Sequence, residues 1–266
     1  MTSLPPAPDL TVPAPLSSDA LATIRRQLRD SGLAVLPDLF DRGYVATLDA
    51  AYQELLASRP ADRVQNTSGQ SHVQMQMPLR PPFSDPVLVA NPVVYQVLAG
   101  VLGDGFGCSY YNSNTAYPGS TRQPVHRDSD HVFGTEQSVP GPPTGIVFNV
   151  PLCDFTVENG STQVWPASHL IVDRPEDKTV RLDDRVPALA AARVNVPAGS
   201  AVLRDPRVWH RGMPNNADHP RSMLAIVYKR RWLSFRHPAL VVPESTWADW
   251  PDLARSIFAA VPRQDG

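Results

Sequence analysis

The chain has 266 residues, of which 42% are hydrophobic and 19% charged, and its formal net charge is −2. These proportions are ordinary for a globular protein with a hydrophobic core. The nearly balanced charge and the lack of a basic run exclude the charge signature of nucleic-acid-binding and membrane-surface proteins. Two cysteines, Cys108 and Cys153, are too few for a disulfide scaffold or a thiolate metal site, so we expect two free thiols.

Proline is unusually frequent, with 29 residues, and it clusters at 5–14, 78–86 and 140–143. Because proline lacks a backbone donor and stops helices, these clusters predict an extended N-terminal arm at 1–16 and long loops elsewhere. The N-terminal sequence has neither the basic start nor the apolar core of a secretory signal. No apolar stretch reaches the roughly 20 residues that cross a bilayer. We therefore expect a cytoplasmic protein with no membrane or nucleic-acid partner.

The first helix is expected directly after the arm. Ser17 is a good capping residue, and apolar residues at helical spacing follow it as far as Leu28. Gly32 ends this pattern, because glycine readily adopts the left-handed conformation that closes a helix. A short apolar strand is expected next, at 33–37.

Two more helices are expected before residue 106. One begins after Asp41, which can cap it, and continues to about Leu55. The other begins at Pro92, a favoured first-turn residue, and continues to about Leu102. The stretch 60–86 between them is polar and irregular in pattern, and we expect loops there.

From about residue 106 the pattern changes to short β-type segments, separated by turn clusters rich in Gly, Pro, Asn and Asp. A run of short strands without helices between them is typical of a sandwich or jelly roll, with the preceding helices packed on one sheet. We see no repeat and no boundary after the arm, so a single, mainly β domain with flanking helices is expected over 17–266. The expected strands lie at 107–114, 145–150, 162–165, 193–196, 200–204 and 223–228.

The motif H-R-D at 126–128 is the first candidate for chemistry. On a strand, positions i and i+2 point to the same face, so His126 and Asp128 can reach one metal ion. The motif alone is weak evidence. Seven histidines in a chain with about a tenth Asp and Glu produce an H-x-[DE] pattern by chance about half the time.

The distal half of the chain strengthens the metal hypothesis. His210 ends a strand-like run, AVLRDPRVWH, and Arg221 opens another strand 11 residues later. Two histidines and one carboxylate on one face of an iron ion form the facial triad of oxygen-activating enzymes. The open positions suit a 2-oxo acid and O2, and the far carboxylate of 2-oxoglutarate suits the planar fork of an arginine. The pattern predicts an Fe(II) site at His126, Asp128 and His210, with Arg221 for 2-oxoglutarate.

Longer stretches of the chain resemble the phytanoyl-CoA dioxygenase superfamily. They are QPVHRD at 123–128, ENGSTQVWPASH at 158–169 and WHRGMPN at 209–215, the last followed by Arg221. Within the superfamily, the chain is most similar to the kanamycin B dioxygenase-like group of natural-product tailoring enzymes. The resemblance implies a double-stranded β-helix, the cupin-like jelly roll, with Fe(II), 2-oxoglutarate and O2 as cofactor and cosubstrates.

The resemblance also assigns roles to individual positions. Asn114 falls where relatives hydrogen-bond the cosubstrate, and Thr162 is expected to line the same pocket. Many relatives carry Ser two residues after the distal histidine, whereas this chain has Gly212. Another donor such as Thr162 must then substitute, or Arg221 acts alone. Halogenating relatives have a small residue in place of Asp128, so this carboxylate favours hydroxylation or another oxidation without halide.

Five further residues are candidate substrate contacts. Gln74 and Gln76 lie in a segment that could form part of a lid over a polar substrate. Asp130 and His131 follow the proposed ligands and either face the substrate or are solvated. Trp165 is either pocket wall or core.

These features predict an Fe(II)- and 2-oxoglutarate-dependent dioxygenase that oxidises a C–H bond of a polar small molecule, in antibiotic or other natural-product biosynthesis. The resemblance suggests an aminoglycoside-like substrate, which acidic residues such as Asp130 and Asp205 would attract. The alternative is a catalytically inactive, cupin-like small-molecule binding protein. A monomer and a homodimer are both compatible with the sequence.

Overall fold

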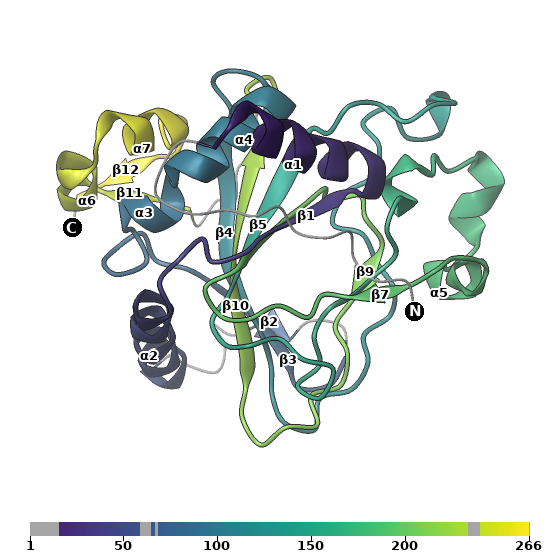
Figure 1. The fold of residues 1–266 in the computed structure, drawn as a ribbon, viewed down its shortest axis with the longest axis horizontal. Coiled ribbons are helices and arrows are strands. Elements are labelled where there is room, and N and C mark those ends of the chain that lie inside the picture. The colour runs from purple at the N-terminus through teal and green to yellow at the C-terminus, as the bar shows by residue number, and fades with distance from the viewer. Residues whose placement is uncertain (1–15, 59–64, 67–68, 234–239, 266) are drawn as a thin grey trace.

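The computed structural model describes residues 16–58, 65–66, 69–233 and 240–265. Except for Leu16, the arm predicted at 1–16 lies outside the described residues. Two antiparallel sheets form the centre of the molecule, and helices cover one side of the larger sheet (Figure 1). This arrangement is the predicted jelly roll with flanking helices.

The larger sheet has seven strands in the order β1-β8-β5-β10-β4-β3-β2, and the smaller has three in the order β7-β6-β9. Several neighbours in the large sheet are far apart in sequence, such as β1 and β8 or β4 and β10, so this sheet joins the N-terminal and C-terminal parts of the chain. The bounds are β1 Leu33–Leu36, β2 Gln65–Asn66, β3 His72–Gln76, β4 Gly107–Ala116, β5 Gly145–Pro151, β6 Gln163–Val164, β7 Ala192–Arg193, β8 Ala201–Arg204, β9 His210–Arg211 and β10 Arg221–Lys229. A separate parallel pair consists of β11 Val242–Pro243 and β12 Arg263–Gln264.

Strand alternation gives the large sheet two different faces. On β10, Leu224 and Ile226 are fully buried in the main hydrophobic core, together with side chains of the flanking helices. The residues between them, Met223 and Ala225, point the other way and line a cavity. Successive side chains of a strand point to opposite faces, so one strand serves the core and the cavity.

The predicted helices form where their capping residues are. Helix α1 (Ser18–Ser31) begins after Ser17, whose side chain accepts a hydrogen bond from the amide of Ala20, and ends at Gly32 with φ of 79°. Helix α2 (Arg42–Ser58) follows Asp41, and helix α4 (Pro92–Leu102) follows Asn91, whose side chain accepts from two first-turn amides. The other helices are α3 Pro86–Val89, α5 Leu182–Arg185, α6 Glu244–Asp249, α7 Asp252–Ile257 and four short 3-10 turns at 134–136, 168–170, 175–179 and 186–188.

The prediction of loops throughout 60–86 is wrong. Strand β3 lies within this stretch and pairs with β4, and α3 begins at its end. The sequence HVQMQ alternates apolar and polar residues from Val73 onward, which is a strand pattern. The alternating pattern is short and prolines follow it, so the sequence analysis did not recognise it as a strand.

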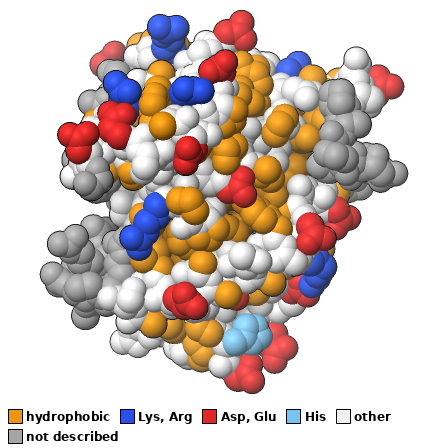
Figure 2. All heavy atoms as spheres, turned by 90° about the vertical axis from the view of Figure 1, so that its left-hand side faces the viewer, with side chains coloured by type: hydrophobic (Ala, Val, Ile, Leu, Met, Phe, Trp, Pro, Cys, Tyr) orange, Lys and Arg blue, Asp and Glu red, His pale blue; other side chains and the backbone are white. Residues whose placement is uncertain are grey.

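None of the described helices is both long and apolar enough to cross a membrane. Figure 2 looks onto the side that carries α2, α3, α6 and α7, where acidic and basic side chains are interspersed among apolar ones. This mixture agrees with the small net charge of −2.

Candidate metal centre and its cavity

A cavity of about 640 Å³ lies between the two sheets. Strand β10 contributes every second residue from Arg221 to Lys229 to its wall, and β5 contributes every second residue from Gly145 to Pro151. The volume falls within the range of small-molecule sites, which is roughly 300–1,000 Å³. The cavity is therefore large enough for a cosubstrate and a substrate together.

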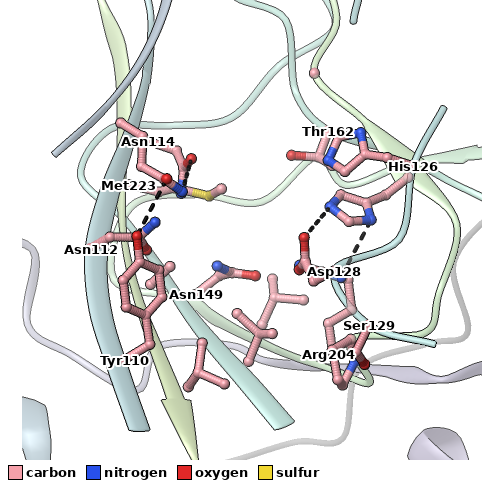
Figure 3. Close-up of a pocket in the computed structure, with 18 of the residues that line it drawn as sticks. Tyr110, Asn112, Asn114, His126, Asp128, Ser129, Asn149, Thr162, Arg204 and Met223 are labelled. Atoms are coloured by element: carbon pink, nitrogen blue, oxygen red, sulfur yellow. Dashed lines mark hydrogen bonds and ion pairs between the residues drawn. The ribbon is translucent and has the colours of Figure 1, made fainter. Parts of the chain in front are cut away.

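His126, Asp128 and His210 meet at one wall of this cavity (Figure 3). One potential ligand atom from each lies within 4.8 Å of the other two. His126 and His210 are joined by two backbone hydrogen bonds of 2.9 and 2.8 Å, and their ring centroids are 4.3 Å apart. The backbone pairing explains how residues 84 positions apart in sequence present their side chains to one point.

Backbone carbonyls fix the orientation of both imidazoles. Nδ1 of His126 is 3.0 Å from the carbonyl oxygen of Pro124, and Nδ1 of His210 is 2.9 Å from that of Val208. Because a carbonyl only accepts, each Nδ1 carries the proton and each Nε2 is left as the metal-binding atom. Burial and the charge of Arg204 lower the pKa of His210 to about 3, so this ligand is neutral at physiological pH.

Asp128 is held by an arginine that the sequence analysis missed. The Nη2 atom of Arg204 donates to Oδ2 of Asp128 at 2.6 Å, while Oδ1 lies 3.6 Å from Nε2 of His210. Burial by itself raises the pKa of Asp128, but the charge and the hydrogen bond of Arg204, together with the neighbouring His210 and His126, outweigh it, and the pKa lies far below its usual range. The carboxylate thus stays ionised, with one oxygen bound and the other directed at the histidines.

Nη1 of Arg204 also lies 3.4 Å from Nδ1 of His210. We treat this approach as a contact, because the proton on Nδ1 already points at the carbonyl of Val208. The sequence signal for Arg204 was its place at the end of an otherwise apolar strand, AVLR. An arginine that is only 6% exposed in such a strand requires a buried partner.

The donor set fits a ferrous ion. Two neutral imidazole nitrogens and one carboxylate oxygen on one side of a point are the facial triad, which leaves positions open for other ligands. The three ligand atoms converge without any change of backbone, and each is oriented by a second partner. Support of this kind is characteristic of metal ligands.

Arg221 closes one end of the cavity. It is 3% exposed, its guanidinium carbon is 4.8 Å from the ring centroid of Phe155, and its Nε has no hydrogen-bond partner within the described ranges. Burial lowers the pKa of Arg221 to about 10, so the group remains charged at neutral pH. A buried cation with an unused donor, facing a cavity, fits the distal carboxylate of 2-oxoglutarate.

Gly212 lies where a serine would require neighbouring side chains to move. A Cβ atom there would lie 2.6 Å from Oε1 of Gln123 and 2.8 Å from Cε1 of His72. Oε1 of Gln123 accepts a hydrogen bond of 2.8 Å from the amide of Gly212. Both side chains line the cavity, so they occupy the space that a serine would need. His72 and Gln123 are the second and third site residues that sequence reasoning missed.

The other cosubstrate candidates also line the cavity. Asn114 lies on β4 opposite Met223, and its Oδ1 accepts from Nε2 of Gln74 at 3.3 Å. Thr162 directly precedes β6 and lies on the side of the triad (Figure 3). Their roles toward 2-oxoglutarate stay predictions.

The predicted substrate residues divide into two groups. Gln74 and Asp130 line the cavity, whereas Gln76, His131 and Trp165 do not. His131 is 6% exposed, and its Nε2 lies 3.1 Å from the carbonyl oxygen of Ile171, which makes it structural.

Trp165 and Asp205 are also structural. Trp165 is buried in a small core cluster with Trp209. Asp205, expected near the mouth, is 1% exposed and paired with Arg207 at 2.7 Å. Short loops around the triad turn these side chains inward, which residue type alone does not reveal.

The phytanoyl-CoA dioxygenase (PhyH) family matches residues 28–223, about three quarters of the chain. Two fungal relatives are the dioxygenase andF of Emericella variicolor and the dioxygenase aneA of Aspergillus aculeatus. The first is 28% identical over 58% of this chain, and this chain spans only 50% of that relative. The second is 24% identical over 88% of this chain and 81% of the relative.

Solved structures of two enzymes from nogalamycin biosynthesis share the fold. The non-haem α-ketoglutarate-dependent epimerase SnoN superimposes with a TM-score of 0.66 and 20% identity, over 80% of this chain and 82% of that one. The carbocyclase SnoK gives 0.65 and 21%, over 82% and 87%. The fold, the convergent triad and the family match agree, and this chain belongs to the phytanoyl-CoA dioxygenase family of non-haem iron, 2-oxoglutarate-dependent oxygenases.

Proposed function

We propose that this protein is a dioxygenase that oxidises a C–H bond of a small molecule in natural-product biosynthesis, with His126, Asp128 and His210 as iron ligands. The observation that carries the proposal is the placement of these three side chains and Arg221 around one cavity. A cavity with only one of these features would suit many functions. Together they suit a 2-oxo acid held between a metal and a guanidinium.

Fe(II) with 2-oxoglutarate supplies an O2-dependent oxidation that releases succinate and CO2. The chain's own residues position these partners. Arg221 binds the distal carboxylate in the buried end of the cavity, and Asn114 and Thr162 contact the same molecule. Arg204 keeps Asp128 ionised and turns one carboxylate oxygen toward the metal. Burial of Arg204 and Arg221 strengthens their charge interactions.

Asp128 also bears on the type of oxidation. Its side chain takes the coordination position that a halide would need, so the proposed reaction incorporates or removes no halide. Hydroxylation, desaturation, ring closure and ketone formation all begin with the same hydrogen abstraction. The two structurally similar nogalamycin enzymes are an epimerase and a carbocyclase, which supports natural-product tailoring as the setting.

The test is succinate formation by the purified protein with Fe(II), ascorbate and 2-oxoglutarate. Slow, substrate-independent succinate formation is expected. Arg221→Gln should raise the KM for 2-oxoglutarate about tenfold or more, because it removes a charge-assisted pair. The anaerobic affinity for Fe(II) should not change, because Arg221 does not touch the triad. Absence of both Fe(II) binding and succinate formation would refute the proposal.

The alternative of a binding protein without turnover predicts a different result. His210→Ala would then leave the biological activity unchanged, whereas the proposed enzyme loses it. A complete triad with its supporting carbonyls and Arg204 favours the enzyme.

A further inference from the structure

On the cavity wall opposite the triad, two asparagines lie in one row across the large sheet. Across the sheet, the register places Val202, Asn149, Ala225 and Asn112 side by side on β8, β5, β10 and β4. All four line the cavity. The two asparagines lie two strands apart, which is about 10 Å. Only the small side chain of Ala225 stands between them, so a ligand can lie across the row and reach both amides.

The side-chain nitrogen of Asn149 is not used in any hydrogen bond among the described residues. The residue is only 7% exposed, and its Nδ2 atom has no hydrogen-bond partner within the described ranges. Its side chain points into the cavity, between the β4 residues and Asp128 (Figure 3). An unsatisfied buried donor costs roughly 1–3 kcal/mol of stability. A ligand oxygen at this point would remove that cost.

The middle of the sheet beside the row is apolar, while Arg204 and Tyr110 stand at the two ends of the next row. Val147 and Val227 lie in the next row of the sheet, and Val132 lines the cavity while 45% exposed. Burial of apolar ligand surface on such walls contributes about 25 cal/mol per Å².

The charges of the cavity argue against an amino sugar. Among the described residues, Asp128 and Asp130 are the carboxylates that line it, and both are already paired, with Arg204 and Arg127 respectively. The lining cations are Arg204, Arg221 and Lys229. A polycation would lose its hydration on entering the cavity, where both carboxylates already have cationic partners. The desolvation of its charges would therefore cost free energy.

We propose that the substrate is an uncharged, largely apolar molecule with two oxygen acceptors, one bound by Asn149 and the other by Asn112, and not a polycationic amino sugar. This inference rests on the proposed function, because it describes the substrate of the same site. The two asparagines orient the molecule, so that the part of its skeleton between the two anchored ends faces the metal ligands.

The first experiment compares binding of two probes by calorimetry. The rigid diketone 5α-androstane-3,17-dione carries oxygens at opposite ends of an apolar skeleton, and neamine is a polycationic amino sugar. Titrations use anaerobic protein with Fe(II) and 2-oxoglutarate, and are repeated with metal-free protein. The diketone should bind at least about tenfold more tightly than neamine. Equal or tighter binding of neamine overturns the inference.

The second experiment uses Asn149→Leu and Asn112→Leu, which keep the side-chain volume. Each should weaken diketone binding about tenfold, the upper end for one lost hydrogen bond. The monoketone 5α-androstan-17-one should lose affinity in only one of the two variants. Asn216→Leu, an exposed position outside the cavity, serves as the matched control and should change nothing. Unchanged diketone affinity in both cavity variants overturns the inference.

Thermal unfolding separates binding from folding. Because Nδ2 of Asn149 has no hydrogen-bond partner in the described part of the chain, Asn149→Leu should unfold at the same or a higher temperature than the unaltered protein. A marked loss of stability would show that the amide is structural and would contradict the inference. Succinate formation by the unaltered protein tests the proposed function by itself. Diketone binding without succinate formation would refute the function and leave the binding site standing.

Discussion

The two sides of the cavity are built differently. On the metal side, each functional atom has a second partner that fixes it: carbonyls for His126 and His210, and Arg204 for Asp128. On the opposite side, the buried Nδ2 atom of Asn149 has no hydrogen-bond partner in the described ranges. Metal ligands must hold one geometry before the ion arrives, so their support is internal. A substrate-binding group gains affinity from the hydrogen bond that the protein itself does not satisfy.

The largest effect is expected from Asp128→Ala, which removes the only carboxylate of the triad. Anaerobic Fe(II) affinity should fall about a hundredfold or more, and succinate formation should stop. Asp218→Ala, in a fully exposed side chain away from the cavity, is the matched control and should behave like the unaltered protein. Retention of tight Fe(II) binding by the alanine variant would mean that other residues form the metal centre.

Arg204→Gln tests whether the residue that holds Asp128, and not only the ligands themselves, contributes to Fe(II) affinity. The carboxylate of Asp128 would lose its 2.6 Å partner, and Fe(II) affinity should fall about tenfold. Arg204→Lys keeps the charge and should recover part of the loss. The readout is the Fe(II) dissociation constant of folded protein, with Arg29→Gln on the surface as control. Equal Fe(II) affinity in the glutamine variant and the unaltered protein would mean that Arg204 does not contribute to metal binding.

Gly212→Ser tests the cosubstrate end. The new Cβ would press on Gln123 and His72, and overpacking of this kind costs roughly 1–3 kcal/mol. The affinity for 2-oxoglutarate should fall about fivefold, measured by titration of the Fe(II) protein. Gly141→Ser is the control, because its Cβ would meet nothing closer than 4.0 Å. Shortening Gln123 to alanine in the serine variant should recover part of the affinity. Tighter 2-oxoglutarate binding by the serine variant would contradict the packing argument.

Asp130→Asn should have the smallest effect. Its side chain is 56% exposed and pairs with Arg127, and exposed ion pairs contribute roughly 0–1 kcal/mol. Fe(II) and 2-oxoglutarate affinities should change less than about twofold. A tenfold loss of Fe(II) affinity would show that the support of the metal side extends to the cavity mouth.

Local patterns were sufficient for the main helices, whereas the candidate metal ligands needed the longer motifs as well. Ser17 and Gly32 bracket α1 because capping depends on a few neighbouring residues. The strand on which the prediction placed His126 and Asp128 does not form, since His126 makes only an isolated bridge and Asp128 lies in a bend, yet the two side chains still reach one point. Arg221 stands at the start of β10 as predicted. The strand β3 was missed because its alternation is short.

The sequence by itself therefore determined the fold class, and it predicted the three residues that converge at the candidate metal centre and the arginine that lines the same cavity, from residue chemistry, spacing and family resemblance. Only the tertiary structure decided which residues support them. Arg204 meets Asp128 from 76 positions away, and Asn149 and Asn112 become neighbours of Ala225 only through the register of three strands. Pairing between distant strands depends on the whole sheet, because each register is fixed by the burial of one complete face. The register of the whole sheet therefore places Asn149, whose Nδ2 has no hydrogen-bond partner among the described residues, opposite the proposed metal ligands.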